Sequence, residues 1–127
     1  MNAALEWLES LQGSGIRPGL SRMRALLHAL GNPHQAYGSI IVAGTTGKGS
    51  TSMMLASILE TAGYRTALYT SPHLVDIRER WIIGREPVRE ELLIESIGTL
   101  QRASRRIDII PTYFEALTLL AFLVFEH

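Results

Sequence analysis

The order of apolar and polar residues predicts two helices at the start of the chain. Leucine and tryptophan recur at helical spacing over residues 3–11, and apolar residues recur in the same way over residues 21–30. The stretch 13–19 between them contains three glycines and a proline and is therefore predicted to be a loop. Gly31 and Pro33 end the second helix, because glycine suits a helix C-cap and a proline just beyond cannot continue the helix.

The next part of the chain predicts a strand, a helix and a second strand. The β-branched run "SIIVAG" at residues 39–44 is bounded by glycine, as is typical of a fully buried strand. Residues 50–62 are good helix formers closed by Gly63, and "RTALYTS" at residues 65–71 again suits a strand. A strand, a helix and a strand within about 30 residues predict a βαβ unit with a parallel strand pair and a right-handed crossover. The predicted fold class is therefore α/β.

Two further helices complete the pattern. Pro87 is expected to open a helix that runs to about Ser104, and a last helix begins in "PTYFE" at residues 111–115. Residues 116–125 are so apolar that this last helix must be covered on every side. The predicted elements are too few to cover it, and a parallel sheet needs helices on both faces. We therefore expect residues 1–127 to be the N-terminal part of a larger domain, and the isolated chain to self-associate through this helix or to be poorly soluble.

Composition and charge narrow the class of partners. The 127 residues are 46% apolar and 19% charged, which is typical of a globular domain. Twelve acidic and twelve basic residues cancel, so no overall field draws the chain toward nucleic acid or a membrane, and neither partner is expected. The absence of cysteine excludes disulfides and thiolate metal sites. The first residues lack a signal-peptide pattern and the longest apolar run is about half of the ~20 residues that cross a bilayer, so a cytoplasmic location is expected.

The strongest candidate for chemistry is the run "GTTGKGS" at residues 44–50. Lys48 is the only lysine among the twelve basic residues of the chain. Glycines between a strand and a helix N-terminus let backbone N–H groups converge on a phosphate, and the helix dipole adds positive potential. The common phosphate-loop pattern requires a glycine where Val42 stands, so this loop is a shorter form. The alternative interpretation is a glycine-rich turn with a solvated lysine.

A second candidate lies at the end of the second predicted strand, in "YTSPHL". The carboxyl ends of neighbouring parallel strands face the same crevice, so Ser71 is expected beside the phosphate loop, where its hydroxyl could coordinate Mg²⁺. On spacing alone, a simple strand-ending turn is the favoured interpretation of Ser-Pro. His73 by itself suggests only a surface residue after that turn.

These motifs together resemble one family. The sequence "VAGTTGKGSTSMMLASILETAGYRTALYTSPHLVDIRERWIIGREPV" is similar to the folylpolyglutamate synthase and dihydrofolate synthase family, a branch of the ATP-dependent Mur ligases. The resemblance extends from about Gly15 to "PTYFEALTLLAF", which is nearly the whole chain. It implies an α/β fold, a P-loop-containing parallel sheet with flanking helices of the Mur ligase central-domain type, of which residues 1–127 are an incomplete portion.

The resemblance also implies a reaction and its partners. ATP phosphorylates a carboxylate of dihydropteroate or folate, the amine of L-glutamate attacks the acyl phosphate, and an amide and ADP result. The implied cofactors are ATP and Mg²⁺, and the full-length enzyme is expected to be a monomer. The family's further metal ligands, its modified lysine and its C-terminal domain are expected beyond position 127, so the chain by itself is expected to be inactive.

Site residues are carried over by position. Lys48 is expected to be catalytic, by neutralising charge on the transferred phosphoryl group, and Ser71 to ligate Mg²⁺. The expected nucleotide-binding residues are Thr45, Thr46, Gly47, Lys48, Gly49 and Ser50. The expected substrate-binding residues are Gly13, Ser14, Gly15, Ile16, His73, Thr112, Tyr113, Phe114 and Glu115.

Three points stay open at this stage. Glu115 also completes a capping box with Thr112 as the N-cap, so it serves either the substrate or the helix. Thr46 and Arg78 stand where the family usually has asparagine, which bears on nucleotide affinity and pocket shape. The alternatives to a folate ligase are a cell-wall Mur ligase, against which "TSPHL" argues, and a nucleotide-binding module without catalytic activity.

Overall fold

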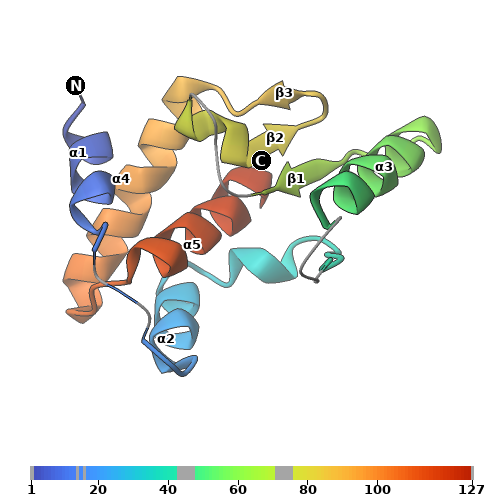
Figure 1. Cartoon of the computed structure of the whole chain (residues 1–127). Helices are drawn as coiled ribbons and strands as arrows, with labels where there is room; N and C mark the ends of the chain where they lie inside the picture. Colours follow the sequence, from blue (N-terminus) through green and yellow to red (C-terminus); the bar gives the residue numbers. More distant parts are fainter. Residues whose placement is uncertain (1, 14, 16, 43–47, 71–75, 127) are drawn as a thin grey trace. The chain divides into compact units, whose positions relative to one another are not determined.

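The computed structural model describes residues 2–13, 15, 17–42, 48–70 and 76–126. The chain divides into two compact units (Figure 1). The first combines Met1–Tyr37 with Glu90–His127, and the second is Gly38–Arg89. The first unit thus joins the two ends of the sequence, and each unit has its own set of contacts.

The first unit is helical. Its two longest helices, α4 (Glu90–Ile107) and α5 (Tyr113–Glu126), pack against each other. The N-terminal helices α1 (Ala3–Ser10) and α2 (Ser21–Ala29) each contact both of them, and the short 3₁₀ helix η1 (Pro33–Gln35) contacts α5 (Figure 1). The helices predicted over residues 3–11 and 21–30 are confirmed, including Gly31 at the end of α2, where φ is +83°.

Helix α5 is the centre of this unit, and the expectation that the chain could not cover it is wrong. The exposed fractions of Leu119, Leu120 and Val124 are all 0%. Helix α4 supplies an apolar stripe at helical spacing, with Leu93, Ile97 and Leu100 buried, while α1, α2 and η1 contact α5 as well. Because α5 is covered within the unit, the expected self-association through this helix loses its physical basis.

Polar contacts fasten the elements around α5. The Tyr37 hydroxyl donates to the Phe122 carbonyl at 3.2 Å, and the ring of His34 lies 5.6 Å from the ring of Phe122. Burial, with a contribution from the negative charge of Glu126, raises the pKa of Tyr37 to about 12, so this hydroxyl keeps its proton well into alkaline solution. The Arg106 guanidinium at the end of α4 donates to the Ala29 carbonyl at the end of α2.

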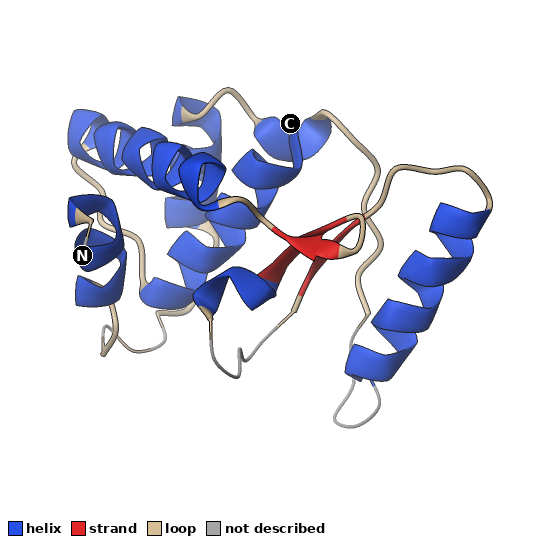
Figure 2. Cartoon of the chain, turned by 90° about the horizontal axis from the view of Figure 1, so that it is seen from above, coloured by secondary structure: helices blue, strands red, loops and turns tan. Residues whose placement is uncertain are grey.

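The second unit holds helix α3 (Lys48–Thr61), the 3₁₀ helix η2 (Ile77–Arg80) and a small sheet. Strands β1 (Ala67–Tyr69), β2 (Trp81–Ile83) and β3 (Glu86–Pro87) lie in that order and pair antiparallel (Figure 2). In the register of the first pair, Tyr69 lies opposite Trp81, and their rings stack at 6.4 Å.

The expected parallel strand pair is wrong for the described residues. Residues 38–42 form no strand, and Ile40 and Ile41 are 65% and 90% exposed. The strand β1 pairs instead with β2, the next strand along the chain, and an antiparallel pairing of this kind needs no helical crossover. The predicted helix closed by Gly63, whose φ is +96°, is confirmed as α3. The α/β class therefore holds, with a sheet that is small and antiparallel in the described part of the chain.

The start of α4 also differs from the prediction. Pro87 lies in the edge strand β3, where proline is tolerated because the outer N–H groups of an edge strand have no ladder partner. The Val88 N–H donates to the Trp81 carbonyl at 2.8 Å and keeps the chain extended past the proline. Helix α4 consequently begins at Glu90 and ends at Ile107, three residues later than predicted at each end. In the described ranges, no helix combines the length and the apolar character needed to cross a membrane.

The central position of α5 predicts a large loss of stability when its core contacts are removed. Leu120→Ala should lower the free energy of unfolding by about 2–5 kcal/mol, because the fully buried side chain leaves a cavity. Phe114→Ala on the same helix is the matched control: Phe114 is 67% exposed, so its removal should cost about 0.5 kcal/mol or less. Urea denaturation of both variants measures the difference. Equal losses would contradict the described burial of α5.

Candidate functional site

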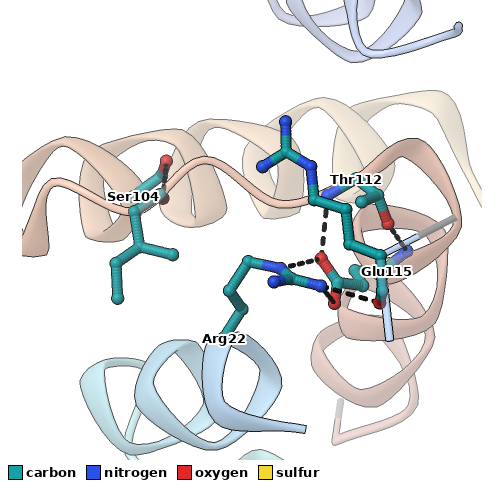
Figure 3. A network of polar contacts seen from close by, with 6 residues as sticks. Arg22, Ser104, Thr112 and Glu115 are labelled. Carbon is teal, nitrogen blue, oxygen red and sulfur yellow. Dashed lines mark hydrogen bonds and ion pairs between the residues drawn. The ribbon is translucent and has the colours of Figure 1, made fainter. Parts of the chain in front are cut away.

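The N-terminus of α5 carries a reciprocal capping box. The Glu115 backbone N–H donates to the Thr112 hydroxyl oxygen at 3.2 Å, and the Thr112 N–H donates to Glu115 Oε1 at 2.9 Å (Figure 3). Both residues are buried, since Thr112 is 3% exposed and Glu115 is 7% exposed. The capping interpretation of "TYFE" is therefore confirmed in its geometry.

A buried carboxylate needs a partner, and Arg22 of α2 provides it. The guanidinium Nε donates to Glu115 Oε1 and Nη2 donates to Oε2, both at 3.1 Å, which makes a bidentate ion pair (Figure 3). Sequence reasoning missed Arg22, because one arginine in an amphipathic helix looks like a surface charge. The signal that could have found it is the burial of Glu115, which requires a cation from some element nearby.

The ionisation of Glu115 reflects these contacts. Burial by itself would raise the pKa of this carboxyl, but the hydrogen bonds from Arg22 and Thr112 and the positive charge of Arg22 outweigh burial and hold its pKa below the ordinary 4.5. Glu115 is therefore an anion at neutral pH whose two oxygens are already engaged. It can orient neighbouring groups, but it is poorly suited to accept a proton.

Arg22 reaches a third acceptor. Its Nη2 also donates to the Arg17 carbonyl at 2.8 Å, at the carboxyl side of the predicted substrate loop. In that loop, Gly13 and Gly15 have φ values of +84° and +76°, a region that favours glycine, whereas Ser14 and Ile16 lie outside the described residues. The structure thus brings the loop and the start of α5, two of the predicted substrate-binding segments, to the same arginine.

The connection from α4 to α5 is also held by local contacts. The Ser104 hydroxyl donates to the Ile109 carbonyl, and the Ile109 N–H donates to the Ser104 carbonyl at 3.1 Å. Ser104 lies on the far side of this connection from Arg22 in Figure 3. These bonds fix the chain just before Thr112. Among the predicted substrate-binding residues of α5, Phe114 is exposed and is the side chain best placed to meet a ligand.

The predicted phosphate loop belongs to the second unit. Lys48, Gly49 and Ser50 form the first turn of α3 and are exposed, and the Lys48 carbonyl accepts a hydrogen bond from the Ser52 hydroxyl at 2.8 Å. The helix expected after the glycine run is therefore present, and its exposed first turn carries backbone N–H groups that have no intrahelical partner. Thr45, Thr46 and Gly47 lie outside the described residues, as do Ser71 and His73.

Arg78, which stands where asparagine was expected, is engaged locally. Its Nε and Nη2 donate to Asp76 Oδ2 at 3.1 and 3.0 Å, at the start of η2. Asp76 and Glu79 form a second capping box there. The arginine thus supports the turn that leads into β2.

Comparison with known proteins gives these sites a context. The chain is 34% identical over 128 residues to a dihydrofolate synthase/folylpolyglutamate synthase of Bacillus subtilis, covering 98% of this chain and 30% of that protein. The crystal structure of a folylpolyglutamate synthase of Thermotoga maritima matches 98% of this chain and 30% of its own with a TM-score of 0.87 and 40% identity. The chain belongs to the folylpolyglutamate synthase and dihydrofolate synthase family.

A third match bears on ligands. The structure of Escherichia coli FolC in complex with DHPP and ADP superposes with a TM-score of 0.86 at 36% identity, over 98% of this chain and 30% of that one. No family model matches the chain. The chain spans about 30% of the length of each of these three proteins.

The depressed pKa of Glu115 predicts a pH-dependent stability. Because the folded-state pKa lies below the ordinary 4.5, the ionised pair stabilises the fold above that pH, and the contribution is lost as pH falls below it. Glu115→Gln should lower the free energy of unfolding by roughly 1–3 kcal/mol near neutrality. It should also reduce the further loss of stability that acidification causes in the unsubstituted chain. Melting temperatures from about pH 7 to about pH 3 measure both effects.

Glu91→Gln is the matched control for this experiment. Glu91 is exposed in the first turn of α4, so its substitution should leave the loss of stability at acid pH as it is in the unsubstituted chain. If Glu115→Gln and Glu91→Gln keep the same dependence on pH, the ion pair does not govern acid stability.

Proposed function

We propose that the full-length protein carrying this segment is an ATP-dependent ligase that joins L-glutamate to dihydropteroate or a folate. The carboxylate of the pterin substrate is phosphorylated by ATP, and the glutamate amine then displaces phosphate to form an amide. The observation that carries the proposal is the likeness over 98% of the chain to a structure in complex with DHPP and ADP. The name of the Bacillus subtilis relative supports both glutamate acceptors, dihydropteroate and folate.

The nucleotide is assigned to the start of α3. The exposed N-terminal turn offers N–H groups and the positive end of the helix dipole to the ATP phosphates, with Thr45, Thr46, Gly47, Gly49 and Ser50 as the remaining contacts. Lys48 supplies a mobile positive charge that stabilises the charge building on the transferred phosphoryl group. Lys48 is therefore the residue to which we assign a catalytic role.

The folate substrate is assigned to the first unit. Arg22 joins the start of α5 to Arg17, the residue that follows the loop 13–16. The exposed Phe114 suits stacking on a flat pterin ring, with Tyr113 beside it in the chain. Glu115 and Thr112 are engaged in the capping box, so we assign them to shaping this end of α5.

Magnesium enters the proposal through Ser71 alone. The described part of the chain contains no group of three or more histidine, aspartate or glutamate side chains that could hold a metal ion, and Ser71 lies outside it. A serine hydroxyl is a suitable oxygen ligand for Mg²⁺ bound to nucleotide phosphates. Ser71→Ala should raise the Mg²⁺ concentration needed for half-maximal ATP binding several-fold, measured by titration. An unchanged requirement would leave Ser71 as a turn residue.

Lys48 provides the decisive test. In the full-length protein, Lys48→Ala should lower the rate of glutamate-dependent phosphate release from ATP by about a hundredfold or more, because a contact to the transferred group commonly contributes a few kcal/mol. The assay contains ATP, Mg²⁺, L-glutamate and dihydropteroate or folate. The melting temperature should change little, because the exposed side chain supports little packing.

Arg89→Ala is the charge-matched control. Arg89 is exposed in the same unit, so removing its charge should leave the rate within a few-fold of the unsubstituted protein. A folded Lys48→Ala protein with a comparable rate would reject the phosphate role. Phosphate release that does not depend on glutamate would reject the ligase itself.

A further inference from the structure

Arg22 is the only described residue whose side chain is seen to join the capping box of α5 to the loop between α1 and α2. Three contacts define it: the two bonds to the Glu115 carboxylate at 3.1 Å and the bond to the Arg17 carbonyl at 2.8 Å. All these atoms belong to the first unit. Thr112 continues the chain of contacts, because its N–H donates to the same Glu115 oxygen that accepts from Arg22 Nε.

The loop needs such a support. Gly13, Gly15 and Gly19 all have positive φ, at +84°, +76° and +99°, and no heavy atom outside the adjoining residues lies within 4 Å of the position that a β-carbon would occupy on any of them. Glycines in open space lose more backbone freedom on ordering than any other residue. Among the described residues of the loop, Gly13, Gly15 and residues 17–20 are all exposed, so apolar burial of these residues does not order them. The bond from Arg22 to the Arg17 carbonyl therefore acts on residues that have little packing of their own.

The ion pair fixes the guanidinium that makes this bond. The Arg22 side chain is 21% exposed and the Glu115 side chain 9%, so the pair is shielded from solvent, and its planar two-bond geometry leaves one orientation for Nη2. Glu115 is in turn fixed by the capping box at the start of α5. Thr112 thus restricts Glu115, Glu115 restricts Arg22, and Arg22 restricts the backbone at Arg17.

We propose that Arg22 is a positioning residue that transmits the fixed orientation of Glu115 to the glycine-rich loop and pre-orders it for the folate substrate. The inference rests on the proposed function for the identity of the ligand. The ordering of the loop by Arg22 depends only on the contacts above. Pre-ordering lowers the entropy lost on binding, so loosening the loop weakens affinity without removing a direct contact. Arg22 itself need not touch the substrate.

The test uses two variants that keep most of the packing. Arg22→Lys retains the charge but cannot make the bidentate pair and the bond to Arg17 together, and Glu115→Gln removes the charge that holds Arg22. At 14.1 kDa the chain suits NMR relaxation measurements. The backbone order parameters of Gly15, Arg17 and Gly19 should fall from about 0.85 to below about 0.6 in both variants, while those of α4 and α5 stay unchanged.

Binding of folate itself, titrated against the same samples, gives the second measurement. The dissociation constant should rise about tenfold in both variants, equivalent to ~1.4 kcal/mol. Arg24→Lys is the matched control: Arg24 is exposed on the same helix, and both measurements should match the unsubstituted chain.

The outcomes separate the two parts of the inference. Unchanged order parameters in the loop would overturn the positioning role. Lower order parameters with unchanged folate affinity would overturn the link from loop order to binding. If the loop loosens as expected but the unsubstituted chain binds no folate, the mechanical role is supported and the assignment of folate to this loop fails.

Discussion

Burial of α5 is the constraint on which the first unit depends. Its leucines and valine, with side chains such as Leu119, Leu120 and Val124, lie fully out of solvent among elements that come from both ends of the sequence. Each such side chain contributes roughly 1.5–3 kcal/mol when removed from water, so together they outweigh any polar contact in the unit. The helices α1 and α2 at one end of the chain and α4 at the other are held together because they share this helix as their core.

Because the apolar helix α5 lies at the centre of the unit, polar groups at its N-terminus need hydrogen-bond partners within the protein. Thr112 and Glu115 are buried at this end, and the capping box supplies acceptors for the N–H groups of both residues. The Glu115 carboxylate of this capping box is itself a buried charge, which Arg22 neutralises. A pair of this kind adds modest stability, but it is directional, and through Arg22 it determines where the Arg17 carbonyl lies. Helix capping and loop geometry are thus two effects of one carboxylate.

The second unit is organised differently. Its sheet is small and helix α3 has no buried residue, while Ile40, Ile41, Met53, Met54 and Ile58 are 61% to 90% exposed. Exposed apolar residues in such number are unusual for a finished core. The chain spans about 30% of the length of its folylpolyglutamate synthase relatives, and the start of α3, where the nucleotide is proposed to bind, lies in this sparsely packed unit.

The existence of the helices was determined by the sequence alone, although α4 begins and ends three residues later than predicted. Helical spacing, the glycines at positions 31 and 63 and the capping box at the start of α5 act through contacts within a few residues, so the pattern shows them directly. The glycine and lysine motif likewise identified the family, because it depends on residue types at fixed spacing. For the candidate site, the sequence supplied the proposed residues, but it missed Arg22 and did not show how the described residues are connected.

Only the tertiary structure decided the contacts between distant segments. The covering of α5, the antiparallel partner of β1 and the exposure of Ile40 and Ile41 depend on which elements meet, and the one-dimensional pattern of a short apolar run is the same whether or not a partner strand is present. Arg22 is the clearest case. It looks like Arg24 two positions away in the sequence, but the fold brings Arg22 to a carboxylate 93 residues further along the chain and leaves Arg24 exposed. That difference arises because helix packing, rather than residue type, determines which charge is buried and must be paired.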